Sequence, residues 1–307
     1  MLTKHRGEFL LALGAVFFSA GGVIVTVVLK YMPAFNLAQV RSISAVVILG
    51  TYVALTRPHL LKAKKAELKR FVVYGVVGFA LVNFGYLLGI ERGVPLALVL
   101  ILEFTAAIWI ALWIKFVRRG YVANEMWLAV FLSFTGLILV SKVWNGFAFD
   151  LIGIAASLLC AFALAAYFLM SEKIGKTREP ISMLIFGMTF ASLFWLVVVP
   201  PWTFPFEVFT TQMDLGGIAA GTMVPGWIMI AAAAIFGTVV PYMLVLSGMK
   251  YLSASTSSVI GMLEPVIAGA FAWIWFAQSW DAVQLMGAAI VLVGIYLADR
   301  AKTAPAQ

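Results

Sequence analysis

Two glutamates lie inside apolar runs of this sequence. Glu264 occurs in "GMLEPVIAGAFAWIWF" (261–276) and is followed directly by the helix breaker Pro265. Glu103 occurs in "LVLILEFTAAIWIALW" (98–113), where a leucine also precedes the acid. A carboxyl in an apolar environment faces a water-filled cavity, pairs with another group or keeps its proton. Each residue is therefore a candidate either for a solute pathway or for a hydrogen-bonded bridge between helices.

The composition indicates which solvent surrounds these runs. Of the 307 residues, 64% are hydrophobic and only 11% are charged, and the mean hydropathy is +1.05. Soluble domains carry about 25% charged residues, whereas a helix needs roughly 20 apolar residues to cross a bilayer core. Only helices and closed barrels pair every backbone amide in lipid, and the unbroken apolar runs exclude the alternating strands of a barrel. The sequence predicts an all-α integral membrane protein with ten transmembrane helices, at about 8–29, 35–56, 70–91, 94–117, 123–141, 150–171, 180–199, 227–249, 252–276 and 280–299.

The loop charges predict an orientation. When the chain starts in the cytoplasm, 17 of the 21 Lys and Arg fall on the cytoplasmic side, three fall outside and Arg41 lies within a span. This positive-inside pattern predicts a multi-pass protein of the cytoplasmic (inner) membrane with both termini in the cytoplasm. It also accounts for the net charge of +8 without a nucleic-acid partner. The loop 201–226 has no Lys or Arg, and we expect it to lie on the outer surface or partly to cover an entrance.

The two halves of the sequence resemble each other. Glu103 and Glu264 lie 161 positions apart in matching segments, and "ANEMWLAVFLSFTGLILV" (123–140) matches "DAVQLMGAAIVLVGIYLA" (281–298). The run that starts at Glu8 likewise parallels the run from Asp150.

The duplication predicts two repeats of five helices, residues 1–145 and 146–307, integrated into one transmembrane domain. Because five is odd, the second repeat must enter the membrane upside down. Inverted repeats are typical of secondary transporters, whose solute sites lie near the midplane, often at interrupted helices.

The acids and the proline fit such a site. At 1.5 Å per residue, Glu103 and Glu264 lie roughly 14 and 18 Å from the nearer ends of their spans, close to the midplane. Pro265 has no N–H and therefore frees a carbonyl one turn earlier, near Gly261; lipid does not tolerate such a carbonyl, but protein or water does. We expect the acid and the break to face a central cavity. Phe104 takes the place of Pro265 in the first repeat, so we expect the fourth span to be continuous.

Other polar and aromatic residues occur in the third, eighth and ninth runs. Their hydroxyl, amide and ring groups suit a substrate with an ammonium, a carboxylate and an apolar side chain, although for each residue a plain packing role stays open. The candidates for substrate binding are Asn83, Tyr86, Pro241, Tyr242 and Ser258.

Arg41 lies about six residues inside its span, so that it either reaches the outer headgroups or attracts a carboxylate into the cavity. The two histidines, His5 and His59, are far apart in predicted cytoplasmic segments, so we expect no metal site, and we expect no cofactor. No protease, ATPase or lipase motif is present, which argues against an enzyme.

The ten-helix plan, the "LEP" of residues 263–265, Arg41 with Ala45, and the pattern from Gly287 to Leu297 resemble the drug/metabolite transporter superfamily, EamA type. The loop pattern is similar to that of the aromatic amino-acid exporters in it. The acid that usually closes the ninth helix of the family is replaced here by Gln278, so no such role carries over.

The resemblance implies a carrier that works by alternating access and exports small organic solutes. We expect its substrates to be amino acids, aromatic and other apolar ones first; the alternative is an exporter of amphipathic drugs, cations or nucleotide-type metabolites. We further expect it to work as a monomer in the lipid bilayer.

Overall fold

The protein is a bundle of long, apolar helices. Its computed structural model describes residues 2–94, 96–142, 150–277 and 280–301. These residues contain ten helices that are long and apolar enough to cross a membrane, which confirms the predicted fold class. They are His5–Val28, Ala34–Thr56, Lys65–Glu91, Leu98–Val117, Asn124–Ser141, Leu151–Ile174, Pro180–Val198, Gly226–Gly248, Ala254–Phe276 and Ala282–Arg300.

Six of the spans are single helices and four are composite. The single helices are α1 (Leu2–Val28), α2 (Ala34–Thr56), α7 (Asn124–Ser141), α8 (Leu151–Ile174), α9 (Pro180–Val198) and α14 (Ala282–Arg300). The third span joins α3 (Lys65–Gly75), the π-helical η2 (Val76–Leu81) and α4 (Val82–Glu91). The fourth joins α5 (Leu96–Phe104), α6 (Ala106–Leu112) and the π-helical η3 (Trp113–Val117). The eighth joins α10 (Gly226–Ala234), the π-helical η8 (Ile235–Val239) and α11 (Val240–Gly248), and the ninth joins α12 (Ala254–Gly261) and α13 (Leu263–Phe276).

Several spans begin at residues that satisfy the first free N–H groups of a helix. The carboxylate of Asp150 accepts from the N–H of Gly153 at the start of α8, and Asp281 accepts from the N–H of Gln284 at the start of α14. Ser253 accepts from Thr256 at the start of α12. Pro180 occupies the first turn of α9, where a missing N–H is tolerated.

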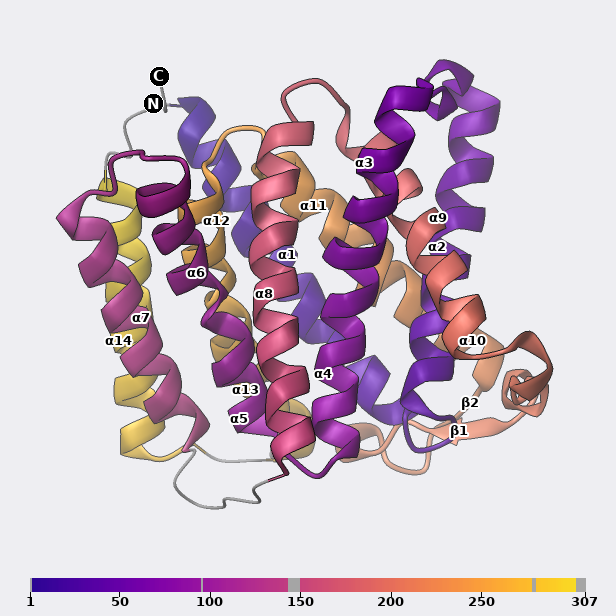
Figure 1. Ribbon diagram of the computed structural model, residues 1–307. Coiled ribbons are helices and arrows are strands. Elements are labelled where there is room, and N and C mark those ends of the chain that lie inside the picture. Colours follow the sequence, from indigo (N-terminus) through magenta and orange to yellow (C-terminus); the bar gives the residue numbers. More distant parts are fainter. Residues whose placement is uncertain (1, 95, 143–149, 278–279, 302–307) are drawn as a thin grey trace.

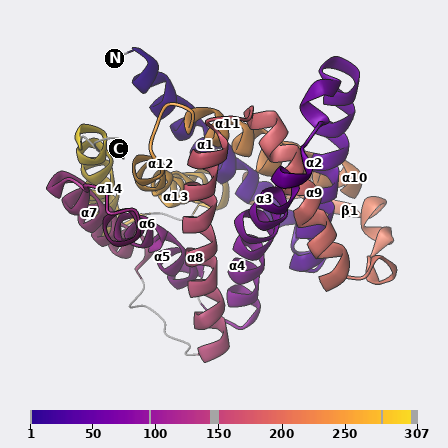
Figure 2. The same ribbon diagram turned by 45° about the horizontal axis from the view of Figure 1, so that its top comes forward.

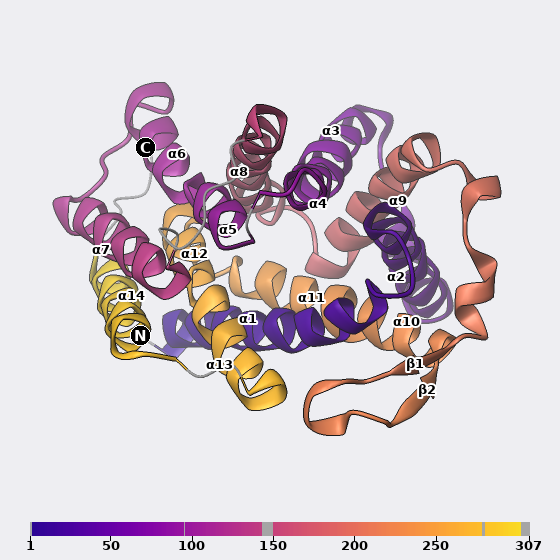
Figure 3. The same cartoon turned by 90° about the horizontal axis from the view of Figure 1, so that it is seen from below.

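Spans of the first half pack mainly against spans of the second half, and the pairings of the two halves correspond. Span one (α1) packs against spans eight and nine, and span six (α8) packs against spans three and four. Span two packs against span seven, and span five against span ten, through α2 with α9 and α7 with α14. Figure 3 shows α7 and α14 at one end of the bundle and α2, α9 and α10 at the other. This is the pattern that a two-fold relation between the halves produces.

The halves run in opposite directions. In Figure 1, α1 begins and α14 ends at the top, whereas α8 begins at the bottom, and the tilted view of Figure 2 agrees. We call the side where α1 begins the terminal side. The predicted boundary between residues 145 and 146 lies outside the described residues.

The fourth span is interrupted, so the expectation that it is continuous was wrong. The hydroxyl of Thr105 donates to the carbonyl of Leu102 at 2.6 Å, and the Thr105 N–H donates to the same carbonyl at 3.1 Å. This tight turn separates α5 from α6 without a proline, because a hydroxyl that bonds the preceding turn competes with the helical ladder. In the ninth span the expected break is present at Met262, between α12 and α13. Both breaks lie two residues from an acid, Glu103 and Glu264.

The π segments η2 and η8 occupy matching places in the third and eighth spans. Gly78 in η2 and Gly237 in η8 are 159 positions apart, as are Asn83 and Tyr242 just beyond them. A π segment widens a helix by one residue and often marks a functional site.

A small β-hairpin lies in the loop between spans seven and eight. Strands β1 (Gln212–Asp214) and β2 (Met223–Pro225) pair antiparallel. The short helices η5 (Pro201–Thr203) and η6 (Phe206–Phe209) precede β1, and η7 (Gly217–Ala219) lies in the connection between the two strands. The N–H of Asp214 donates to the hydroxyl of Tyr31 at 3.0 Å, at the end of span one. The hairpin covers the ends of α1, α10 and α13 on the side away from the terminal side.

Candidate functional site

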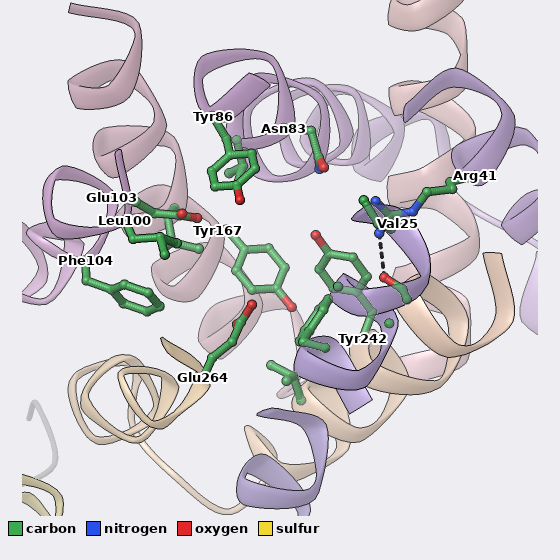
Figure 4. A pocket seen from close by; sticks show the side chains of 17 residues that line it. Val25, Arg41, Asn83, Tyr86, Leu100, Glu103, Phe104, Tyr167, Tyr242 and Glu264 are labelled. Carbon is green, nitrogen blue, oxygen red and sulfur yellow. Dashed lines mark hydrogen bonds between the residues drawn. The ribbon is translucent and has the colours of Figure 1, made fainter. Parts of the chain in front are cut away.

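A cavity of about 210 Å³ lies between the two halves of the bundle (Figure 4). It brings together five of the predicted site residues: Asn83, Tyr86, Glu103, Tyr242 and Glu264. Its wall includes the expected spans three, four, eight and nine, and also spans one, two and six. Neither α7 nor α14 contributes to it. The other lining residues are Phe18, Gly21, Gly22, Val25, Arg41, Val82, Leu100, Phe104, Leu164, Tyr167, Gly237 and Val245.

The two acids approach the cavity from opposite repeats. Glu103 comes from the last turn of α5, and its carboxyl lies beside the thiol of Cys160 on α8. Glu264 comes from the first turn of α13 and points toward the centre of the cavity (Figure 4). No hydrogen bond or ion pair joins its carboxyl to another described residue. A carboxyl that faces open space is available to a solute.

Arg41 is the cation of the cavity wall. Its Nε donates to the hydroxyl of Thr238 at 2.8 Å, and its Nη2 donates to the carbonyl of Gly237 at 2.5 Å. The side chain therefore points into the bundle, and the alternative that it reaches the outer headgroups was wrong. The reason lies in Pro241, which has no N–H to give to the carbonyl four residues earlier, that of Gly237. Arg41 donates to that carbonyl.

Asn83, Tyr86 and Tyr242 complete the polar wall of the cavity. Asn83 and Tyr86 lie on one face of α4, three residues apart, and Nδ2 of Asn83 donates to the Phe79 carbonyl in η2 at 2.9 Å. Tyr242 lies on α11, where its ring contacts that of Phe18 at a centroid distance of 4.9 Å. In Figure 4 the hydroxyls of Tyr86 and Tyr242 point into the cavity, and the Asn83 amide lies above the Tyr242 hydroxyl.

Four other predicted site residues lie behind the cavity wall. Ser258 is buried on α12, where its hydroxyl donates to the Ser255 carbonyl at 2.9 Å. Pro241 and Pro265 are buried, and Gly261 ends α12 beside the break. These four residues are absent from the cavity lining. The prolines shape the two helices, and the carbonyl of Glu264, next to Pro265, accepts from the hydroxyl of Ser19 on α1 at 3.0 Å.

Tyr167 lines the cavity although the sequence does not distinguish it from other aromatic residues in apolar spans. It lies on α8, and its ring contacts those of Phe79 and Tyr242 at centroid distances of 5.3 and 6.1 Å. The one available signal was the repeat: Tyr167 is 142 positions from Val25, the offset that also joins Asp150 to Glu8. Val25 lines the cavity too.

An aromatic layer is packed between the cavity and the terminal side. Tyr74, Phe79 and Tyr167 are buried and stack or meet edge to face. The hydroxyls of Tyr74 and Ser171 share a hydrogen bond of 2.8 Å that links span three to span six. Still nearer the terminal side, Arg178 pairs with Glu67.

The arrangement provides groups that can bind a small solute. Two carboxyls face a cavity that also carries one guanidinium, three tyrosines and one amide. Among the described residues no cluster of His, Cys, Asp or Glu has the makings of a metal site. Such a wall suits a small solute with both charged and apolar parts, because ligand pockets are mostly apolar with few placed polar groups.

The matched halves, the ten spans and the central cavity define a class, that of multi-pass membrane transporters. The chain belongs to the EamA-like transporter family, whose model matches residues 5–142 and again 151–298. The double match agrees with the duplication in the sequence.

Relatives and a solved structure support the same class. An uncharacterized transporter of Archaeoglobus fulgidus is 30% identical over 77 residues, which cover 25% of this chain and 28% of that protein. The uncharacterized transporter YyaM of Bacillus subtilis is 22% identical over 245 residues, 77% of this chain and 76% of that one. A protein known from a crystal structure superposes with a TM-score of 0.75 at 15% identity, covering 95% of this chain and 96% of its own; it shows the fold alone.

Proposed function

We propose that the protein is a secondary transporter that exports amino acids, aromatic and other apolar ones first, by alternating access. The observation that carries this proposal is the presence of Arg41, Glu103 and Glu264 in one cavity wall with aromatic rings. An amino acid presents a carboxylate, an ammonium and a side chain, and this wall has a partner for each.

The charged ends of the substrate decide its orientation. The carboxylate binds at Arg41, whose five N–H donors include two that already hold Thr238 and Gly237 in place. The ammonium binds at Glu264, the acid with open space before it, with Glu103 across the cavity. Charge-assisted hydrogen bonds are roughly twice as strong as neutral ones, so these contacts set the basic affinity.

The aromatic residues decide which side chain is preferred. Tyr86, Tyr167 and Tyr242 come from three spans and surround the remaining volume. An aromatic pair in an edge or offset geometry contributes about 0.5–1.5 kcal/mol beyond its buried area. Phenylalanine, tyrosine or tryptophan therefore gains most from this wall, and a short polar side chain gains least.

Alternating access follows from the paired halves. The buried Tyr74–Phe79–Tyr167 layer is the barrier that we assign to the terminal side, which we take as cytoplasmic because of the positive-inside pattern. Rocking of one repeat against the other opens that layer and closes the opposite side around the same acids. The protein then acts as a monomer whose two repeats are its moving parts.

Counterflow of labelled solutes in proteoliposomes tests this function. Phenylalanine and leucine should exchange saturably, and phenylalaninamide, which lacks the carboxylate, should exchange poorly. Tetraphenylphosphonium tests the alternative function, export of amphipathic cations. The cavity wall favours this alternative in one respect, because it has two acids, Glu103 and Glu264, and one cation, Arg41. Exchange of the cation without exchange of any amino acid would replace the first function by the second.

A further inference from the structure

A second cavity lies on the outside of the bundle, between the second half of span four and span six. It has a volume of about 730 Å³, against about 210 Å³ for the central cavity. Helix α6 packs directly on α8 here, and Trp109 and Phe162 touch with ring centroids 4.4 Å apart. We call this the α6–α8 groove; its wall is formed by Trp109, Leu112, Trp113, Phe116, Val117, Arg118, Phe162, Ala165, Ala166, Leu169, Met170 and Lys173.

The groove is apolar along its length and cationic at one end. Ten of its twelve lining residues are apolar or aromatic, and the other two are Arg118 and Lys173. Arg118 directly follows the span that ends at Val117, and Lys173 lies in the last turn of the span that ends at Ile174. Both cations are therefore at the level of the lipid headgroups on the terminal side, while the apolar part extends into the hydrocarbon region.

Local geometry holds this end of the groove in place. The N–H of Arg118 donates to the carbonyl of Trp113, five residues back, at 3.0 Å, the π-helical pattern of η3. Its Nη1 donates to the carboxylate of Glu172 at 2.7 Å, which leaves other donors of the guanidinium free for a second anion. Lys173 is exposed, and no ion pair joins it to another described residue.

We propose that the α6–α8 groove binds an anionic phospholipid, with an acyl chain against Trp109, Phe162 and Ala166 and the phosphate held by Lys173 and Arg118. Charge complementarity selects this occupant. An amino-acid solute would leave its charges unmatched in the apolar part. A second copy of this chain, packed on the same face, would bring its own two cations to the same level of the membrane.

The test measures lipid binding to the purified full chain in detergent by native mass spectrometry, with dioleoyl phosphatidylglycerol and dioleoyl phosphatidylcholine as probes. A basic residue near the surface contributes about 1 kcal/mol toward an anionic lipid, which corresponds to about fivefold in affinity. Phosphatidylglycerol should bind at least fivefold more tightly than phosphatidylcholine. Lys173→Glu should remove most of that preference, whereas Lys69→Glu, an exposed lysine on the same side but away from the groove, should retain it.

A bulky side chain placed in the groove tests whether the groove binds the acyl chain of the lipid. Ala166→Trp should weaken both lipids, and Leu159→Trp, at an exposed position on the same helix outside the groove, should weaken neither. Equal binding of the two lipids, or the same affinity in Lys173→Glu as in the wild type, overturns the proposal. Competition by inorganic phosphate alone would also overturn it, because that result indicates a site for free anions. A dimer that Ala166→Trp dissociates would overturn it as well, because that result indicates an interface between copies of the chain. None of these outcomes depends on transport.

Discussion

Arg41 in span two and Thr238 in span eight are joined by a hydrogen bond of 2.8 Å from Nε to the hydroxyl oxygen. This contact links the first repeat to the π segment of the second and fixes the one cation of the cavity wall. The position that corresponds to Arg41 in the second repeat, counted from the matching prolines Pro33 and Pro180, is Met188. The acids are thus duplicated and the cation is not, so a bound solute has a defined orientation.

Replacing Arg41 by methionine, the residue of the other repeat, should weaken amino acids selectively. A hydrogen bond to a charged group contributes about 1.5–3 kcal/mol, so the KM for phenylalanine should rise by about 12- to 140-fold. The KM for phenylalaninamide should barely change. Counterflow with both solutes measures the difference, and Arg92→Met, at an exposed arginine away from the cavity, is the control. An equal change for both solutes would contradict carboxylate binding at Arg41.

Tyr86→Ala and Tyr242→Ala should shift selectivity away from aromatic substrates. Each lost ring contact is worth about 0.5–1.5 kcal/mol, which corresponds to a loss of about 2- to 12-fold for phenylalanine relative to leucine. Tyr86→Phe and Tyr242→Phe keep the ring and should keep the preference. Competition assays with the two amino acids give the ratio, and Tyr121→Ala is an exposed control. Unchanged ratios in both alanine variants, with unchanged melting temperatures, would remove these tyrosines from the site.

A cysteine placed in the cavity should be accessible to water, whereas one on the outer faces of spans five and ten should not. Cys160 is the one cysteine of the sequence and is buried, so Cys160→Ser gives a background for labelling. In that background Val25→Cys should react with a membrane-impermeant thiol reagent, and phenylalanine should slow the reaction. Phe131→Cys and Leu292→Cys, exposed on α7 and α14, face lipid and should stay unlabelled. Labelling mainly on α7 and α14 would mean that the cavity is misplaced.

The ion pair between Lys142 and Asp281 should make stability depend on pH. The hydrogen bond from Lys142, followed by that from the Gln284 N–H, lowers the pKa of Asp281 below its usual 3.8. A lowered carboxyl pKa stabilises the fold above the ordinary pKa, and this contribution is lost as pH falls through the lowered value. Asp281→Asn retains a helix-capping oxygen but loses the pair, so its melting temperature should be below that of the wild type at pH 7 and equal to it at low pH. Thermal melts from pH 7 to pH 2 measure this difference in melting temperature, with Glu125→Gln at an exposed position as the control. A difference between wild type and Asp281→Asn that stays constant with pH would contradict the prediction.

Much of the fold could be predicted because membrane spans are long and uniform. Each of the ten helices overlaps an apolar run, and the caps at Asp150, Ser253 and Asp281 are visible as residue types. The break at Thr105 was missed because a threonine interrupts a helix only when its hydroxyl bonds the preceding turn, which the sequence does not reveal. A proline reveals its own break, as Pro265 does.

The site was predicted in part for a related reason. Acids in apolar runs are conspicuous, so Glu103 and Glu264 were found, and Asn83, Tyr86 and Tyr242 lie beside them. Tyr167 was missed because an aromatic residue in an apolar span looks the same whether it faces lipid, core or cavity. Ser258 was interpreted as a substrate contact, yet its hydroxyl is bonded within its own helix. In a helix that is apolar on all sides, the sequence does not show which face points to the cavity, because the packing of neighbouring helices decides this.

The central claim is that the two acids carry the transport chemistry, and Glu264 is the more directly placed of the two. Glu264→Gln is nearly isosteric and should keep the melting temperature. Glu103→Gln should have a smaller effect on transport, because Glu103 lies at the wall beside Cys160 whereas Glu264 points toward the centre of the cavity. Loss of stability with normal transport would instead indicate a bridge between helices.

The most direct measurement is phenylalanine counterflow between pH 5.5 and pH 8.5, in proteoliposomes that contain the wild type, Glu264→Gln or Glu103→Gln. We predict that transport by Glu264→Gln falls and no longer varies with pH, while Glu103→Gln retains part of both. Wild-type rates with a wild-type pH profile in both glutamine variants would contradict the account.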